Sequence, residues 1–221
     1  MSIDHSHTAL IMVDSQAGAL DNPYWGTARS NPAYEANVIK LLKAFRSLQG
    51  EDGPRIVHGP AGPHIVHVYH RSLNPASPLH STSPGMAFHE ISHPAAHETV
   101  FPKTTNSAFQ GSDLGEYLRA KKCWKIYFAG LSVDHCLGTT VRHASDLDVG
   151  KHADARGDNV PGQLMLIGDA TAAWAKHGGK YDAETIHGIH LESLKGEFCR
   201  VVSTEEVLKE LGIHEGEVLE M

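Results

Sequence analysis

The sequence predicts an α/β fold in which a mostly parallel sheet is covered by helices on both faces. Three observations predict it: apolar runs of strand length recur along the 221 residues, helical patterns lie between them, and cap or stop residues bound several of those helices. Strands that alternate with helices form parallel sheets, because each helix carries the chain back across a face of the sheet. The prediction is a three-layer α/β/α arrangement.

Six segments have the length and apolar character of buried strands. They are residues 8–14 (TALIMVD), 64–70 (HIVHVYH), 98–103 (ETVFPK), 124–130 (WKIYFAG), 164–170 (LMLIGDA) and 198–203 (FCRVVS). The sequence therefore predicts a sheet of six strands.

The first helix is predicted over residues 33–49, where Val38, Leu41, Leu42 and Phe45 recur at helical spacing before Gly50, a usual helix stop. Two later helices begin with a capping-box pattern, in which a polar N-cap residue is followed three positions on by Glu. They are the segments from Asp113 with Glu116, and from Ser203 with Glu206, the latter ending at Gly212.

Two more helices are predicted after the fourth and fifth strands. Leu137, Val141, Ala144 and Leu147 form one face of the first, and residues 181–196 form the second. The stretch between these strands at 148–163 (DVGKHADARGDNVPGQ) has no apolar periodicity, so we interpret it as an inserted surface loop that could contact another subunit.

Composition narrows the class of protein. With 41% hydrophobic residues, the chain can bury a full core, and residues 1–221 fit one domain. The formal net charge is -7, and the basic residues are not concentrated in one block of the sequence. We therefore expect small solutes as partners and no nucleic acid. The sequence has neither a leader-like N-terminus nor a span of about 18 apolar residues, so we expect no membrane contact. Its three cysteines are scattered, which fits a reducing compartment, and we expect a cytoplasmic protein.

Three ionisable residues follow predicted strands. Ligands of open parallel sheets bind beyond the carboxyl ends of the strands, where Asp14, Lys103 and Cys136 would gather. A free thiol near pKa ~8.5 needs help to react as thiolate. Lys103 and the first turn of a helix could favour the negative charge, while Asp14 could accept the thiol proton and return it to a leaving amine.

These residues lie in motifs that resemble a known family. The stretches LIMVDSQ with Asp14, VFPKTTNSAF with Lys103, AGLSVDHCLGTTVRHA with Cys136, and IGDATAAW resemble the isochorismatase-like cysteine hydrolases, in order and in spacing. That superfamily includes nicotinamidases and N-carbamoylsarcosine amidohydrolases. The resemblance implies a Rossmann-like hydrolase fold, a small-molecule substrate and a homo-oligomer, a dimer or larger.

The resemblance also implies roles. Cys136 matches the nucleophile, Asp14 the general base and acid, and Lys103 the cation beside the thiolate. It implies a cis peptide between Leu131 and Ser132, and an oxyanion hole formed by the backbone N–H groups of Ser132 and Cys136. The expected reaction is cleavage of a C–N bond in an amide or ureide through a thioester. The alternatives are an isochorismatase-type enol-ether hydrolase and a non-catalytic protein of this fold.

The chain departs from the nicotinamidase pattern, which has an Asp-x-His metal motif after the second strand. Here that stretch offers His67, His70 and His80 and no aspartate. We therefore expect no metal and no other cofactor.

Loops supply the remaining candidates. The long segment after the first strand contains Tyr24, Trp25 and Arg29, and we expect these residues to contact the substrate. Arg29 in particular is a candidate to bind a carboxylate group of the substrate. The alternative is that Trp25 packs the loop onto the body or onto a neighbouring subunit. Phe109 is either pocket wall or core.

Two residues beside Cys136 have expected roles of their own. Asp134 is expected to cap the helix that starts there, and His135 to lie at the edge of the site.

Overall fold

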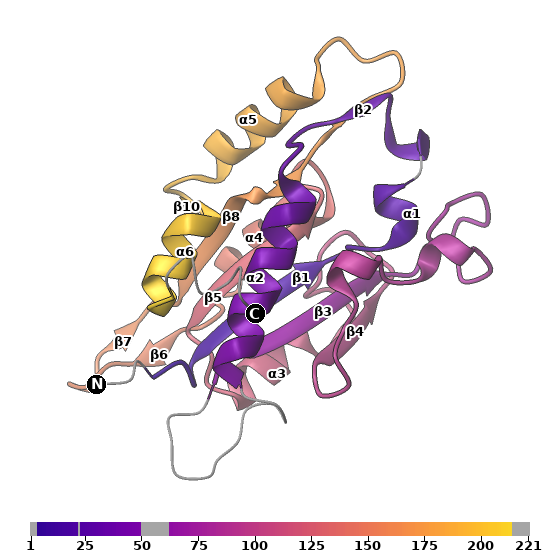
Figure 1. Ribbon diagram of the computed structural model, residues 1–221. Coiled ribbons are helices and arrows are strands. Elements are labelled where there is room, and N and C mark those ends of the chain that lie inside the picture. Colours follow the sequence, from indigo (N-terminus) through magenta and orange to yellow (C-terminus); the bar gives the residue numbers. More distant parts are fainter. Residues whose placement is uncertain (1–3, 22, 50–61, 214–221) are drawn as a thin grey trace.

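The centre of the molecule is a six-stranded parallel sheet (Figure 1). The computed structural model describes residues 4–21, 23–49 and 62–213. The sheet has the order β10-β8-β5-β1-β3-β4, and all neighbouring strands run parallel. Its strands are β1 (Thr8–Val13), β3 (His64–His70), β4 (Thr99–Lys103), β5 (Lys125–Leu131), β8 (Gln163–Ala172) and β10 (Arg200–Val202). Each of the six predicted segments therefore forms one strand.

The strand order places a crevice beside β1. From β1 the chain moves outward through β3 to β4, then returns to the other side of β1 with β5 and continues outward through β8 to β10. The direction of winding reverses between β1 and β5. In open α/β sheets this switch point is where the loops separate and ligands bind, so the carboxyl ends of β1 and β5 define the expected site.

Helices cover both faces of the sheet (Figure 1). α2 (Tyr34–Gln49) and α6 (Thr204–Leu211) lie on one face, whereas α3 (Leu114–Ala120), α4 (Cys136–Asp146) and α5 (Ala183–Leu194) lie on the other. In β1, Leu10 and Met12 pack with the first group, and Ala9, Ile11 and Val13 with the second. All six residues of β1 are buried, which explains why its sequence is continuously apolar instead of alternating.

The helix termini confirm some sequence signals and correct others. Ser203 and Glu206 form the predicted capping box, and α6 ends at Gly212 with φ 75°. Asp113 is the N-cap of α3, but its side chain makes no capping hydrogen bond, so the predicted capping box there is wrong. Leu147 lies beyond the end of α4 and is 52% exposed, so it does not belong to the buried face. Gly50 lies outside the described residues.

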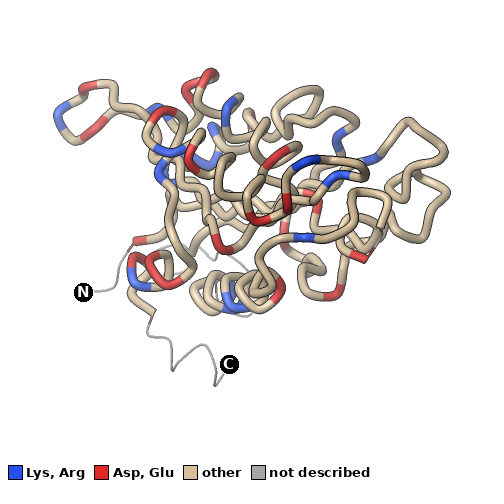
Figure 2. The backbone as a smooth tube through the Cα atoms, turned by 90° about the horizontal axis from the view of Figure 1, so that it is seen from above, with Lys and Arg blue, Asp and Glu red and all other residues tan. Residues whose placement is uncertain are grey.

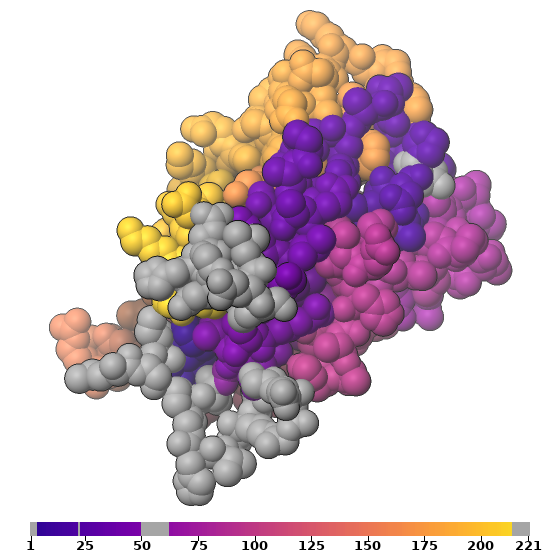
Figure 3. Space-filling model, viewed as in Figure 1, coloured from indigo at the N-terminus to yellow at the C-terminus, as the bar shows by residue number. Residues whose placement is uncertain are grey.

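The long segment after β1 contains short elements. They are α1 (Ala17–Leu20), the 3-10 turn η1 (Pro23–Trp25) and β2 (Ala28–Arg29), which pairs antiparallel with β9 (Trp174–Ala175). Two further turns, η2 (Pro84–Met86) and η3 (Glu90–Ser92), lie between β3 and β4. Figure 3 shows the segment after β1 (indigo) adjoining the segment before β4 (magenta) at the carboxyl end of the sheet.

The expected surface loop at 148–163 is a small hairpin. β6 (His152–Ala153) pairs antiparallel with β7 (Asn159–Val160). Figure 1 shows it beside the amino ends of the strands, at the opposite end of the molecule from α1 and β2. Short polar strands without an apolar face leave no periodicity in the sequence, which is why the hairpin was not predicted.

Positions of Lys and Arg are interspersed with positions of Asp and Glu along the described backbone (Figure 2). Among those residues, no helix has the length and apolar character that crossing a bilayer requires.

Candidate active site

Asp14 lies directly after β1, at the switch point. Its N–H donates to the Val68 carbonyl at 2.8 Å, which continues the hydrogen bonding between β1 and β3. Its backbone has φ 52°, a left-handed conformation that Asp tolerates better than most residues. The carboxylate is nearly buried, with the side chain 5% exposed.

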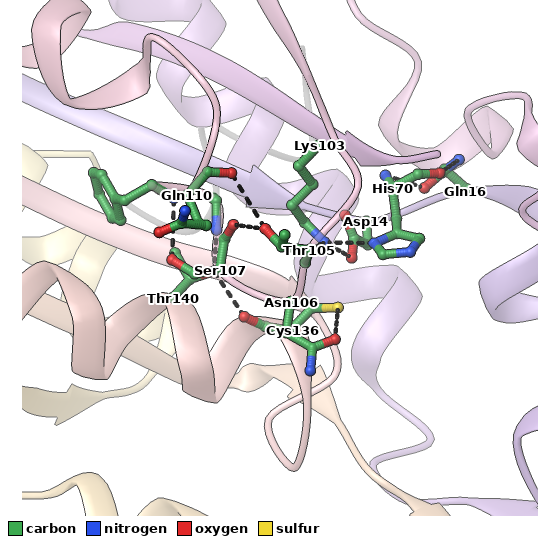
Figure 4. Close-up of polar contacts among 12 residues, drawn as sticks. Asp14, Gln16, His70, Lys103, Thr105, Asn106, Ser107, Gln110, Cys136 and Thr140 are labelled. Carbon is green, nitrogen blue, oxygen red and sulfur yellow. Dashed lines mark hydrogen bonds and ion pairs between the residues drawn. The ribbon is translucent and has the colours of Figure 1, made fainter. Parts of the chain in front are cut away.

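Lys103, the last residue of β4, connects three groups at this edge (Figure 4). Its Nζ donates to Asp14 Oδ2 at 2.6 Å, to His70 Nδ1 at 3.0 Å and to the Thr105 carbonyl at 3.1 Å. The side chain of Lys103 is 0% exposed. An ammonium group has three N–H donors, and here all three have acceptors.

The charge states of this group follow from its surroundings. Burial alone would lower the pKa of Lys103, but the adjacent Asp14 carboxylate outweighs it and raises that pKa above its ordinary value. Burial, and next the Lys103 charge, lower the pKa of His70. The site therefore holds an ion pair of Asp14 and Lys103 beside a neutral imidazole.

Cys136 is the first residue of α4 and reaches the same edge from β5. The Leu131–Ser132 peptide is cis, as the resemblance implied. Gly130 has φ 114°, and a Cβ at this position would lie 2.1 Å from the Val13 carbonyl oxygen. Only glycine fits where β5 passes so close to β1 and turns toward Cys136.

The surroundings of the Cys136 thiol oppose its ionisation. Burial and then the Asp14 carboxylate raise its pKa above the ordinary value, and Lys103 offsets only part of this. Its Sγ donates to Asn106 Oδ1 at 3.6 Å. Lys103 acts on the thiol in the expected direction, but burial and Asp14 outweigh it, so the expectation that Lys103 and the start of α4 favour the thiolate stays a prediction.

The other cysteines differ from Cys136 in position. Cys123 and Cys199 are buried within the core, and burial raises their pKa values to about 12 and about 11.

Two backbone N–H groups beside Cys136 have no protein acceptor. Val133 N donates to Ala172 O, while His135 N and Leu137 N both donate to Ser132 O. Within the described part of the chain, the amides of Ser132 and Cys136 make no such hydrogen bond. They are the two donors expected to form an oxyanion hole.

A pocket of about 90 Å³ opens over these groups. It is lined by Asp14, Ala19, Trp25, His70, Leu79, Asn106, Leu131, Ser132, His135, Cys136, Trp174 and Lys176. Trp25 is held by a hydrogen bond from its Nε1 to the Gly18 carbonyl at 2.7 Å. Two tryptophans and short aliphatic chains therefore form the walls, while the polar groups are concentrated around Cys136.

A second ion pair lies at the pocket rim. Lys176 Nζ and His135 Nδ1 each lie 2.9 Å from Asp134 Oδ2. The Asp134 side chain is only 4% exposed, and its hydrogen bonds with His135 and Lys176 hold its pKa well below the usual carboxyl range despite burial. Asp134 therefore holds Lys176 and His135 and does not cap α4, whose N-cap is His135. The predicted cap is wrong, but His135 does lie at the pocket edge.

The residues predicted to contact substrate separate into two groups. Trp25 lines the pocket, but Tyr24, Arg29 and Phe109 do not. Arg29 pairs with Glu35 and lies 5.1 Å from the centre of the Tyr34 ring. Arg29 thus lies outside the pocket lining with its charge paired to Glu35, and its binding of a substrate carboxylate stays a prediction.

Phe109 and Tyr24 also lie outside the pocket lining. Phe109 packs against the core beneath α3 and α4, with its ring edge-on to His143, which supports the core alternative. Tyr24 packs edge-on against Trp25 and is 44% exposed.

The three histidines considered as metal ligands do not share a site. His67 is buried and lies 2.8 Å from Glu98 Oε2, and His80 Nδ1 lies 2.8 Å from Thr82 Oγ1. Among the described residues, a different set has ligand atoms within 4.8 Å of one another: Asp14, His70 and Cys136. The Lys103 ammonium donates to two of these three, so a second cation there would meet its charge.

The sequence did not indicate six of the pocket residues as parts of the site: His70 as a partner of Lys103, Ala19, Leu79, Asn106, Trp174 and Lys176. One of them had a usable signal, because His70 ends a predicted strand in the same way as Lys103.

Comparisons with known proteins agree with this geometry. The isochorismatase domain model matches residues 8–206. The isochorismatase family protein YrdC of Bacillus subtilis (strain 168) is 32% identical over 205 residues, covering 91% of this chain and 95% of that protein.

Solved structures share the fold over nearly the whole chain. An isochorismatase-family protein from Chromobacterium violaceum ATCC 12472 is 29% identical with a TM-score of 0.76, covering 96% of this chain and 97% of that one. A cysteine hydrolase from Pseudomonas syringae pv. phaseolicola 1448A has a TM-score of 0.75 at 20% identity, covering 96% and 95%. Family model, relative and fold agree, and the chain belongs to the isochorismatase family of hydrolases.

Proposed function

We propose that this protein is a cysteine hydrolase that cleaves the C–N bond of a small amide or ureide. The observation that carries the proposal is that Asp14 and Cys136 line one pocket beside two unpaired amides, with the buried Lys103 donating to Asp14 behind them. A thiol next to a carboxylate base and a cation is the arrangement that nucleophilic acyl transfer requires.

The proposed reaction begins with proton transfer from the Cys136 thiol to Asp14. As Asp14 becomes neutral, Lys103 loses its negative partner and its charge stabilises the new thiolate. The sulfur attacks the carbonyl carbon, and the oxyanion accepts hydrogen bonds from the amides of Ser132 and Cys136. Asp14 then gives its proton to the departing nitrogen as the C–N bond breaks, which leaves a thioester.

Hydrolysis of the thioester completes the cycle. Asp14, again a carboxylate, takes a proton from water, and the resulting hydroxide attacks the thioester carbon. The acid product leaves, and the proton returns to the Cys136 sulfur. Each group ends in its starting state.

The pocket favours a small uncharged substrate. Its fixed charges form pairs, Asp14 with Lys103 and Asp134 with Lys176, while Arg29 is held by Glu35. The walls are mainly Trp25, Trp174, Leu79 and Leu131. Burying a charged group against such walls without a free counter-ion is costly, so a neutral amide should bind better than its carboxylate-bearing analogue.

A substrate panel tests the proposal. Wild type and Cys136→Ala are assayed with small neutral amides and ureides, matched carboxylate-bearing amides, and isochorismate. We expect turnover of a neutral amide or ureide by wild type and a loss of at least about a thousandfold in Cys136→Ala. Equal turnover by both proteins on isochorismate would instead favour an enol-ether hydrolase, and inactivity of both on every compound would favour a non-catalytic role.

A further inference from the structure

We propose that His70 is a positioning residue of this site, whose unprotonated Nδ1 holds the Lys103 ammonium group beside Asp14. The catalytic part of this inference rests on the proposed function, whereas the contact itself does not.

The hydrogen bond with Lys103 determines which ring nitrogen of His70 carries the proton. Lys103 Nζ lies 3.0 Å from His70 Nδ1, and an ammonium group can only donate. Nδ1 must then be the acceptor, so the neutral ring carries its proton on Nε2. The surroundings favour this neutral form, because burial and the Lys103 charge lower the pKa of His70.

The contact decides where the ammonium group lies. Asp14 and His70 accept from Lys103 through side chains, at 2.6 and 3.0 Å, and the Thr105 carbonyl completes the set at 3.1 Å. When Asp14 becomes protonated during the reaction, its hold on Lys103 weakens. His70 then remains as a side-chain acceptor that keeps the charge near Cys136, to whose sulfur a His70 ring nitrogen lies within 4.8 Å.

The fold holds His70 in position from the backbone side. The fully buried Gln16 side chain accepts from His70 N at 2.8 Å and donates to His70 O at 3.1 Å, as Figure 4 shows. His70 also pairs in register with Lys103 across β3 and β4. These contacts fix the backbone of His70 beside Lys103, so the ring starts from a defined position, as expected for a residue that orients another group.

Matched amide substitutions separate a positioning role from simple packing. In His70→Asn the side-chain oxygen can take the place of Nδ1, whereas in His70→Gln the amide reaches the position of Nε2, and His70→Leu fills the space without an acceptor. On a substrate found in the panel, we expect His70→Asn to keep kcat within about tenfold of wild type. We expect His70→Gln and His70→Leu to lose about ten- to a hundredfold in kcat with smaller changes in KM. Thermal unfolding checks that all three variants are folded.

A spectroscopic readout does not depend on activity. The ¹⁵N shifts of the His70 ring at neutral pH should show an unprotonated Nδ1 and a protonated Nε2, and the Nδ1 signal should move in Lys103→Met. A protonated Nδ1, or full activity in His70→Leu, would overturn the inference. If wild type hydrolyses nothing in the panel, the proposed function fails, and the spectrum alone decides whether the contact exists.

Discussion

At the scale of single residues, Cys136 and Asp14 are coupled in two opposing ways. The carboxylate raises the pKa of the thiol in the free site, yet the same carboxylate is the base that the proposed attack needs. A protonated thiol reacts slowly with unrelated electrophiles, while a bound substrate brings the carbonyl carbon to the sulfur as the proton leaves. The coupling therefore predicts a separation of two properties: slow reaction of the free thiol with alkylating reagents, and efficient attack once a substrate is bound.

Alkylation kinetics test that separation. Only thiolate reacts, so a raised pKa predicts that the iodoacetamide rate at Cys136 reaches half of its maximum well above pH ~8.5, the value at which a free thiol is half ionised. In Asp14→Asn the repulsion is removed and Lys103 lacks its negative partner. We expect faster alkylation near pH 7.5 in this variant, with hydrolysis lost.

The exposed Asp146→Asn on the same helix is the control and should match wild type. Slower alkylation in Asp14→Asn than in wild type would contradict the account. Peptide mass spectrometry distinguishes Cys136 from Cys123 and Cys199, which are buried in the core.

Lys176 offers a prediction about specificity. If Asp134 neutralises Lys176 at the rim, Asp134→Asn should free that charge. The quantity compared is kcat/KM on a carboxylate-bearing amide divided by kcat/KM on the matched neutral amide. We expect this ratio to be about tenfold higher in Asp134→Asn than in wild type. An unchanged ratio would show that the rim charge does not select substrates.

At the scale of elements, the two capping-box patterns provide a matched pair. Ser203 caps α6 through Glu206 N, whereas the Asp113 side chain caps nothing in α3. Ser203→Ala should lower the free energy of unfolding by about 1 kcal/mol, and Asp113→Ala by less than about half of that. Urea denaturation measures both, and an equal loss would mean that the caps do not differ in solution.

Elements also show what the sequence could predict. Strand 8–13 was predictable because both of its faces are buried, which produces an unbroken apolar run. Asp14, Lys103 and Cys136 were predictable because each lies at or shortly after the carboxyl end of a predicted strand. The hairpin at 152–160 was not, because its two-residue strands bury no apolar face.

Other features depend on partners that are distant in sequence. Arg29 was expected in the pocket, but Glu35 and Tyr34 hold it away, and no pattern in its own loop shows this. Lys176 and Asp134 are 42 positions apart and meet only because β8 and β5 are neighbours. Such contacts are set by tertiary packing, so a propensity argument cannot supply them.

At the scale of the whole molecule, an ion pair with a buried carboxylate links the sheet to its helical cover. Glu98, just before β4, has a side chain that is 0% exposed and accepts from Arg46 of α2 at 2.7 Å, with His67 of β3 at 2.8 Å. Despite burial, these partners and the Ala95 amide hold the pKa of Glu98 well below its usual range.

The sign of the resulting pH dependence is fixed. Because Glu98 has a lower pKa folded than unfolded, its contribution is complete above the unfolded Glu value of ~4.3 and is lost as the pH falls below it. Glu98→Gln should destabilise the protein at pH 7 by about 2 to 4 kcal/mol and make unfolding less sensitive to acid between pH 5 and 3. Chemical denaturation across that range measures both effects, and a parallel pH profile in the variant would refute the assignment.

The central claim is that Cys136 forms a thioester with the substrate. Acid quenching of wild type during turnover of an amide found in the panel, followed by mass spectrometry, tests it directly. We predict that the peptide containing Cys136 gains the mass of the acyl fragment, and that this adduct is absent in Cys136→Ala. Turnover by Cys136→Ala at the wild-type rate, or an acyl adduct on a different residue, would contradict the account.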